Sequence, residues 1–142
     1  MVRRFRDPWS KNWQGSDLAD ANLTEVYLTD ANRAFVNLTG ANLTGANLTG
    51  AILRHCNLSR ADLPGADSTD ADLVGTDLTR ANLTGARLTH ADLNNADMTG
   101  AIVSNANLAD ADLTGVDLTH TNLINANWID AIGADFTGAI LK

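Results

Sequence analysis

The chain has 142 residues with a formal net charge of −7, a length that suits one small domain, and its single cysteine excludes an intramolecular disulfide. No apolar run approaches the ~20 residues of a membrane span, and the arginines at the start are not followed by the apolar segment of a signal peptide. We therefore expect a soluble, cytoplasmic protein without a membrane span.

Residues 1–15 combine basic and aromatic side chains and differ in charge from the rest of the chain. Residues 1–16 hold four basic residues against one acidic, whereas 17–142 hold six basic against sixteen acidic. This segment is predicted either to cap the apolar end of the fold that follows or to dock onto a protein partner. Four charges are a weak signal for direct nucleic-acid or lipid binding. The candidate contact residues are Arg3, Arg4, Arg6, Trp9 and Trp13.

From Ser16 to Asp130 the chain repeats every five residues in one unbroken phase, twenty-three times. The middle residue of each unit is Leu in eighteen cases, and the residue two places before it is Ala in sixteen. The other three positions hold mainly Asp or Asn, Thr or Ser, and turn-forming residues. Two positions per unit are therefore predicted to face inward and three to face solvent.

A period of five fits neither the helix nor the strand, so an amphipathic element of either kind is excluded over this length. A short-period solenoid remains, in which each unit forms one side of a coil and neighbouring coils stack. A disordered low-complexity tract would not hold leucine in phase over so long a stretch.

The units AlaAsnLeuThrGly at 41–45 and 81–85 match the consensus A(D/N)LXX almost literally, and the sequence here resembles the pentapeptide-repeat proteins. The resemblance implies an all-β fold, a right-handed quadrilateral parallel β-helix with four units per coil. Residues 16–142 would then form about six coils, stacked to a height of roughly 28 Å at the spacing of neighbouring strands.

Three residues depart from the inward pattern. Cys56 occupies a small inward position and is interpreted as a filler the size of alanine rather than a reactive thiol. Ser68 and Arg33 occupy centres. A buried serine can bond to nearby backbone. Arg33 cannot be buried without a partner, so we expect a local bulge there that lets Phe35 turn inward.

Four units per coil place residues twenty apart in columns. Two such columns are acidic and lie on neighbouring sides; they comprise Asp72, Asp92 and Asp112, and Asp77, Asp97 and Asp117. Stacked carboxylates repel one another unless cations, asparagines or a basic partner offset the charge. The six aspartates are therefore either a tolerated solvated surface or a partner-binding edge.

The phase slips after Asp130, where AlaIleGly at 131–133 is predicted to be extra before two further units. Ile124 and Ile129, beside Trp128, are candidates for a contact patch. Some members of the resembled family end in a helix that caps the coil and pairs two subunits, and no such helix is legible here. The last coil is predicted to be exposed or covered by another chain, which favours homo-association through it.

Catalysis finds little support, because the three histidines fall at corner positions of separate units and do not converge with a nucleophile. We expect no enzymatic activity, no cofactor and no metal site. The first functional hypothesis is a scaffold that presents regular faces to an unidentified protein partner.

The second hypothesis is an acidic mimic of DNA. The resemblance extends to quinolone-resistance members of the family, which implies binding to a type II topoisomerase, DNA gyrase. Those members are longer, carry phenylalanine at many centres, and use a C-terminal dimerising helix and often loops, all of which are missing here. The scaffold is therefore the preferred prediction.

Overall fold

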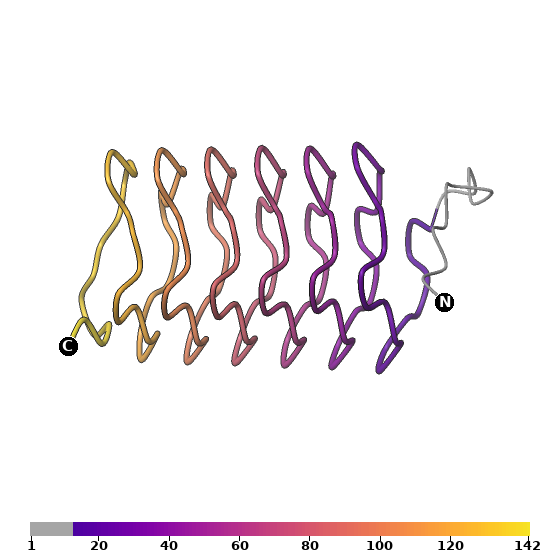
Figure 1. Cartoon of the computed structure of the whole chain (residues 1–142), viewed down its shortest axis with the longest axis horizontal. Helices are drawn as coiled ribbons and strands as arrows, with labels where there is room; N and C mark the ends of the chain where they lie inside the picture. The colour runs from indigo at the N-terminus through magenta and orange to yellow at the C-terminus, as the bar shows by residue number, and fades with distance from the viewer. Residues whose placement is uncertain (1–12) are drawn as a thin grey trace.

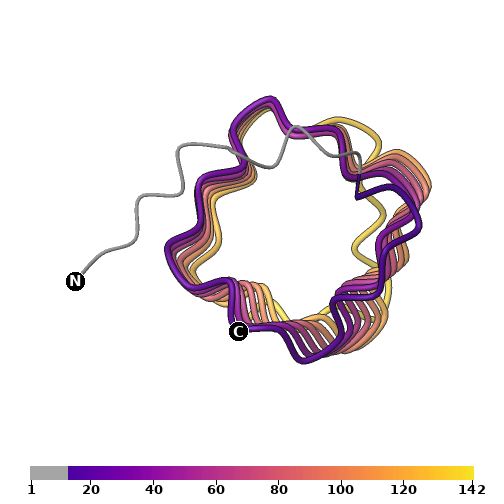
Figure 2. The same ribbon diagram turned by 90° about the vertical axis from the view of Figure 1, so that its right-hand side faces the viewer.

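The computed structural model describes residues 13–142, which wind into a single stack of coils (Figure 1). Viewed along the stack, the backbone traces a closed four-sided outline (Figure 2). The bridges between coils are all parallel and, with one exception near the C-terminus, join residues twenty apart. The predicted all-β quadrilateral parallel β-helix is confirmed.

Each unit has the same five positions, which the unit 81–85 illustrates. A small inward residue is followed by the bridging residue, the inward centre, a residue that is usually Thr or Ser, and a corner residue with positive φ. We call these the small, bridging, centre, hydroxyl and corner positions. The strand on each side is a single bridging residue between turns, and no α-helix occurs in residues 13–142.

The backbone explains why five residues make a unit. Three N–H groups bond to the coils above and below, and one closes the turn, which leaves the hydroxyl-position N–H without a backbone acceptor. In the unit 81–85 the donors and acceptors are Asn82 to Ala61, Leu83 to Ile102, Gly85 to Ser104 and, for the turn, Ala81 to Leu78, at 2.9, 2.7, 3.0 and 3.0 Å. The side chain of Asn82 accepts the remaining bond, from the Thr84 N–H at 3.1 Å.

The bridging residues define four outward faces. Face 1 carries Asp17, Asn37, Asn57, Asp77, Asp97 and Asp117. Face 2 carries Asn22, Asn42, Asp62, Asn82, Ile102, Asn122 and Ile140. Face 3 carries Tyr27, Asn47, Asp67, Arg87, Asn107 and Asn127. Face 4 carries Asn32, Ile52, Asp72, Asp92, Asp112 and Ile132.

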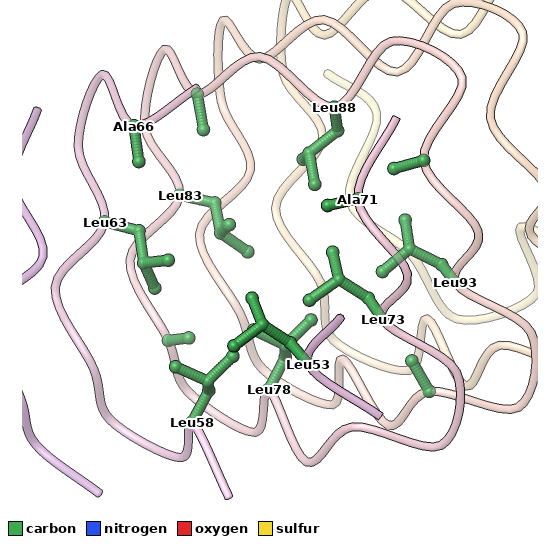
Figure 3. Close-up of a cluster of buried hydrophobic side chains, with 14 of the residues drawn as sticks. Leu53, Leu58, Leu63, Ala66, Ala71, Leu73, Leu78, Leu83, Leu88 and Leu93 are labelled. Atoms are coloured by element: carbon green, nitrogen blue, oxygen red, sulfur yellow. The ribbon is translucent and has the colours of Figure 1, made fainter. Parts of the chain in front are cut away.

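The centres and small residues form one continuous core along the axis of the coil. Leucines from successive coils stack inside it, as Leu63 and Leu83 do (Figure 3), and both are at most 2% exposed. Buried polar residues at the small position are satisfied by backbone. The hydroxyl of Thr76 donates to the Leu73 carbonyl, and that of Thr121 donates to the Met98 carbonyl, each at 2.7 Å.

The expected bulge at Arg33 is wrong. Asn32 keeps its bridge to Ile52, Arg33 is only 6% exposed, and Phe35 stays outward at a corner, 55% exposed. The guanidinium is accommodated inside the first coils because it lies 4.5 Å from the ring centroid of Trp13, and its Nη1 donates to the Asn32 carbonyl at 2.8 Å. The Trp13 ring and the Asn32 carbonyl thus hold the guanidinium inside the coil.

The phase slip is also resolved differently from the prediction. Ala131 and Ile132 are not extra residues, because Ile132 bridges Asp112 in the normal register. The next bridge joins Asn122 to Ile140, only eighteen residues apart. The side at 131–133 is therefore a shortened unit of three residues. A Cβ at Gly133 would lie 2.6 Å from the Thr114 Cα, so only glycine permits this close passage.

Corner side chains lean toward the corner of the next coil, which gives some glycines a second role. A Cβ at Gly75 would lie 2.5 Å from the His55 Nδ1, whereas a Cβ at Gly85 would meet nothing within 4 Å. The two glycines have nearly the same φ, +64° and +65°. His55 is itself held by stacking on Phe35, with ring centroids 5.2 Å apart.

We expect Gly75→Ala to lower the free energy of unfolding by about 1 kcal/mol more than Gly85→Ala, since both pay the same cost of positive φ and only the first also displaces a ring. Urea denaturation of both variants measures the difference. In the His55→Ala background the two substitutions should become equivalent. A difference that survives there would contradict the packing explanation.

Candidate interaction surface

The N-terminal opening of the coil is covered by Trp13. This side chain packs against the apolar core and, with Leu28, Arg33 and Val36, lines a cavity of about 10 Å³ at the mouth of the coil. Its carbonyl accepts the Ser16 N–H at 2.7 Å, which ties it to the first unit. Trp13 thus lies over the apolar core at this end of the described coil. The other predicted contact residues of this segment, Arg3, Arg4, Arg6 and Trp9, lie outside the described residues.

The two predicted acidic columns exist in the structure. Asp72 bridges Asp92, which bridges Asp112, on face 4, and Asp77, Asp97 and Asp117 form the matching ladder on face 1. The corner between these faces carries small residues at this height, namely Gly75, Asn95 and Gly115. The six carboxylates therefore lie on both sides of one edge of the rod, where the corner side chains are small.

Each of these carboxylates has a structural task that the sequence did not reveal. Asp77 accepts bonds from both the N–H and the hydroxyl of Thr79, at 2.9 and 2.7 Å, in the same way that Asn82 caps Thr84. The column on face 4 has further partners. Arg54 pairs with Asp72, and the Asn94 side chain donates to Asp92 at 2.7 Å. Arg54 thus offsets part of the charge on face 4, whereas the partners of Asp77, Asp97 and Asp117 are neutral threonines.

The turn bonds lower the pKa of several carboxyls. Bonds from the Thr114 hydroxyl and N–H, and from the Asn94 side chain, lower the pKa of Asp112 below its usual range. The Thr119 hydroxyl and N–H do the same for the pKa of Asp117, and those of Thr137 for the pKa of Asp135. At Asp67 burial raises the pKa, but bonds from Thr69 and the charge of Arg87, 3.5 Å away, outweigh it.

The predicted C-terminal contact residues do not share one face. Ile124 occupies a hydroxyl position on face 2 and Ile129 the corresponding position on face 3, where it is 66% exposed. Trp128 is half-buried at a centre and contacts Phe136, with ring centroids 5.2 Å apart. Its ring therefore covers the C-terminal opening of the coil instead of joining the two isoleucines in a lateral patch.

One surface feature was not predicted from the sequence. Phe35 and His55 stack at neighbouring corners between faces 4 and 1, with an interplanar angle of 23°. Both residues occupy the corner position of the repeat twenty residues apart, so the column rule contained the signal. The pair forms an exposed aromatic projection above the acidic edge.

The groups that could carry chemistry are dispersed or inert. Among residues 13–142 no three His, Cys, Asp or Glu side chains are grouped so as to hold a metal ion. The Cys56 thiol is buried and donates to the Arg33 carbonyl at 2.9 Å, and burial raises its pKa to about 11. It therefore stays protonated at neutral pH, as expected of a structural cysteine.

A family model described as pentapeptide repeats matches the chain over residues 12–45, 34–67, 41–80, 69–100, 91–127 and 101–142. These segments together span nearly the whole chain. The chain belongs to the pentapeptide-repeat family. Members of this family are generally non-enzymatic structural proteins whose fold is a right-handed β-helix.

Two solved pentapeptide-repeat structures illustrate the similarity. HetL, involved in the regulation of heterocyst differentiation in the cyanobacterium Nostoc sp. strain PCC 7120, is 36% identical with a TM-score of 0.53, over 88% of this chain and 61% of its own. The present chain thus spans about three fifths of the length of HetL. QnrB1, a plasmid-mediated fluoroquinolone resistance protein, is 21% identical with a TM-score of 0.50, over 94% and 84% of the two chains, and shows the shared fold alone.

Two other comparisons complete the picture. Rfr23, a pentapeptide-repeat protein of the cyanobacterium Cyanothece 51142, is 32% identical over 80% of this chain and 88% of its own, with a TM-score of 0.42. A comparison with curated protein sequences gave no significant match. No helix among the described residues of this pentapeptide-repeat chain is long and apolar enough to cross a membrane.

The lowered pKa values predict acid sensitivity of a definite sign. A carboxyl whose pKa is lower in the folded than in the unfolded chain stabilises the fold above its unfolded pKa, and this contribution is lost as the pH falls through the folded pKa. The melting temperature should therefore fall below about pH 4. Replacing Asp112, Asp117 and Asp135 by Asn should reduce that fall, because the amide keeps the turn and does not titrate.

A matched control is Asp30→Asn, Asp70→Asn and Asp130→Asn, which makes the same change of charge at corner positions outside the turn bonds. Its acid-induced fall should resemble that of the unmodified protein. Thermal melts between pH 6 and pH 2, at roughly constant ionic strength, compare the three proteins. Equal protection by both triple variants would refute the role given to the turn bonds.

The position of Trp13 predicts a local cost at the N-terminal end. Trp13→Ala should lower the free energy of unfolding by about 2 kcal/mol, since it uncovers Leu28 and removes the ring that faces Arg33. The most affected amides should be those of the first two coils, which hydrogen exchange can localise. Unchanged exchange at residues 18–38 would show that Trp13 covers nothing of consequence.

Proposed function

We propose that the protein is a non-enzymatic scaffold with a regulatory role, which presents its flat faces to a protein partner. The similarity to HetL is the observation that carries this proposal, because HetL is involved in regulating differentiation and the two sequences are 36% identical over 88% of this chain. The geometry supports it as well. A regular rod offers extended surfaces of fixed spacing, which suit binding of another macromolecule better than enclosure of a small substrate.

The partner contacts proposed for this scaffold lie at the projections and ends of the rod. Ile129 is the most exposed large apolar side chain among the described residues, and Phe35 projects with His55 from a corner. Exposed aromatic and large apolar side chains that a partner can bury are typical of interface anchors. The N-terminal segment with Arg3, Arg4, Arg6 and Trp9, and association of copies through the C-terminal coil, remain predictions of the same scaffold hypothesis.

The alternative is an acidic mimic of DNA that binds gyrase, and one observation favours it. The aspartates of faces 1 and 4 lie in two ladders on either side of an edge whose corners are small. A basic groove in a partner would meet carboxylates on both walls of that edge. The ladders also cap their own turns, however, so their presence is accounted for without a partner.

Binding to purified gyrase separates the two functions. The scaffold hypothesis predicts no binding by the unmodified protein even at low salt, where exposed charges act over the longest range. Binding that weakens steeply between ~0.05 and ~0.2 M salt would overturn the scaffold in favour of the mimic.

The variant for this comparison replaces all six aspartates of the two ladders by Asn. It removes six charges but keeps every turn bond, so a loss of gyrase binding would report charge and not unfolding. Under the scaffold hypothesis the same variant should still bind the cellular partner, whereas Ile129→Asp or Phe35→Asp should lose it. Partner recovery by quantitative mass spectrometry, with Ile52→Asp as a control on face 4, provides the readout.

A further inference from the structure

Face 2 differs in charge from faces 1 and 4. Among its bridging and hydroxyl positions within the described chain, Asp62 and Lys142 are the charged residues. Face 1 carries four aspartates and face 4 carries three with one exposed arginine. Face 3 adjoins a corner with the carboxylates of Asp30, Asp70, Asp110 and Asp130. For a chain of net charge −7, approach of two copies through face 1 or face 4 would bring columns of carboxylates together, whereas the acidic side chains on face 2 and its two corners are Asp20, Glu25 and Asp62.

We propose that face 2 is a self-association surface, through which two rods pack side by side and parallel, related by a two-fold axis that runs along the rods. This inference goes beyond the scaffold role and does not depend on the identity of any other partner. The occupant of the face is a second copy of the same chain. Three features of the face support this choice over an unrelated protein.

The first feature is its hydrogen-bonding pattern. In the units at Asn42 and Asn82 the side-chain oxygen accepts the N–H of Thr44 and Thr84, at 3.0 and 3.1 Å, which leaves the amide NH₂ groups to donate outward. Within residues 13–142 these NH₂ groups make no hydrogen bond to another side chain. The threonine oxygens retain lone pairs as acceptors. A two-fold axis along the rod sets the asparagine column of one copy against the threonine column of the other, so donors meet acceptors in both directions.

The second feature is apolar. Ile102 and Ile140, 42% and 44% exposed, flank Asn122 in the same bridging column, and Ile124 lies in the neighbouring hydroxyl column. Face 2 thus gathers three isoleucines at its C-terminal end. Burial of such side chains against a second copy gives the non-directional part of the association.

The third feature is the shape of the two corners that border the face. One corner bears Arg60 and Arg80 on neighbouring coils, and neither arginine forms an ion pair with another described residue. The opposite corner bears Gly65 and Gly85, where a Cβ would meet nothing within 4 Å. The proposed axis brings the arginine corner of each copy to the bare glycine corner of the other, which is the self-complementarity that a two-fold interface requires.

Substituting Asn by Asp tests the surface without disturbing the fold, because Asp77 caps its turn as Asn82 does. Asn42→Asp with Asn82→Asp would bury four new carboxylates in the proposed interface and remove the amide donors that face the threonines of the other copy. Sedimentation velocity should show a dimer for the unmodified protein and a dimerisation constant weakened tenfold or more for this variant. The control, Asn47→Asp with Asn57→Asp, adds the same net charge on faces 3 and 1 and should leave dimerisation within about twofold.

A second variant tests the orientation of the two copies. Asn already occupies positive-φ corners at Asn95, Asn105 and Asn125, so Gly65→Asn with Gly85→Asn should fold while filling the space for the partner's arginines. We expect this variant also to weaken the dimer at least tenfold. A monomeric unmodified protein at concentrations up to roughly 1 mM would overturn the proposal. A dimer that both face-2 variants leave intact would overturn it equally, since association would then use another surface such as the C-terminal coil.

Discussion

The fold depends on one constraint, which is that the backbone N–H groups of each unit need hydrogen-bond acceptors. Every five residues offer five N–H groups, of which three bond to adjacent coils and one closes the turn. In the units with Asn or Asp at the bridging position, the side-chain oxygen of that residue accepts the fifth N–H, at the hydroxyl position, as in the units of Asn42, Asp77 and Asn82. The exception at Pro64 illustrates the rule, because proline has no N–H and stands at the one position where the coils use none.

This constraint changes how the acidic composition is understood. Half-buried or exposed aspartates such as Asp77 and Asp97 were open to interpretation as a binding surface, yet each closes its own turn. The same bonds lower the pKa of Asp112 and Asp117, so the charges stabilise the folded state that carries them. A surface of carboxylates is therefore no sign of a partner by itself. Face 2 is more informative, because most of its bridging residues are neutral asparagines and not aspartates.

The two ends of the rod solve a different problem, which a solenoid always faces. Trp13 covers the first coil and shields the inward Arg33, while Trp128 and Phe136 contact one another at the last. The aromatic residues are thus concentrated where the five-residue pattern cannot supply a neighbouring coil. Between the ends, leucine and alanine suffice, because each coil covers the next.

The sequence alone determined the coil, since an unbroken period of five with inward Leu and Ala has no other way to bury its apolar residues. The columns followed from the resemblance to the pentapeptide-repeat family, which implies four units per turn and so places residues twenty apart above one another. Tertiary structure decided what local pattern cannot show. Arg33 stays inside because Trp13, twenty residues earlier, lies against it, and Ile132 keeps its register because Asp112 fixes it from the coil below. These outcomes depend on contacts between coils, which the order of residues within a single unit does not contain.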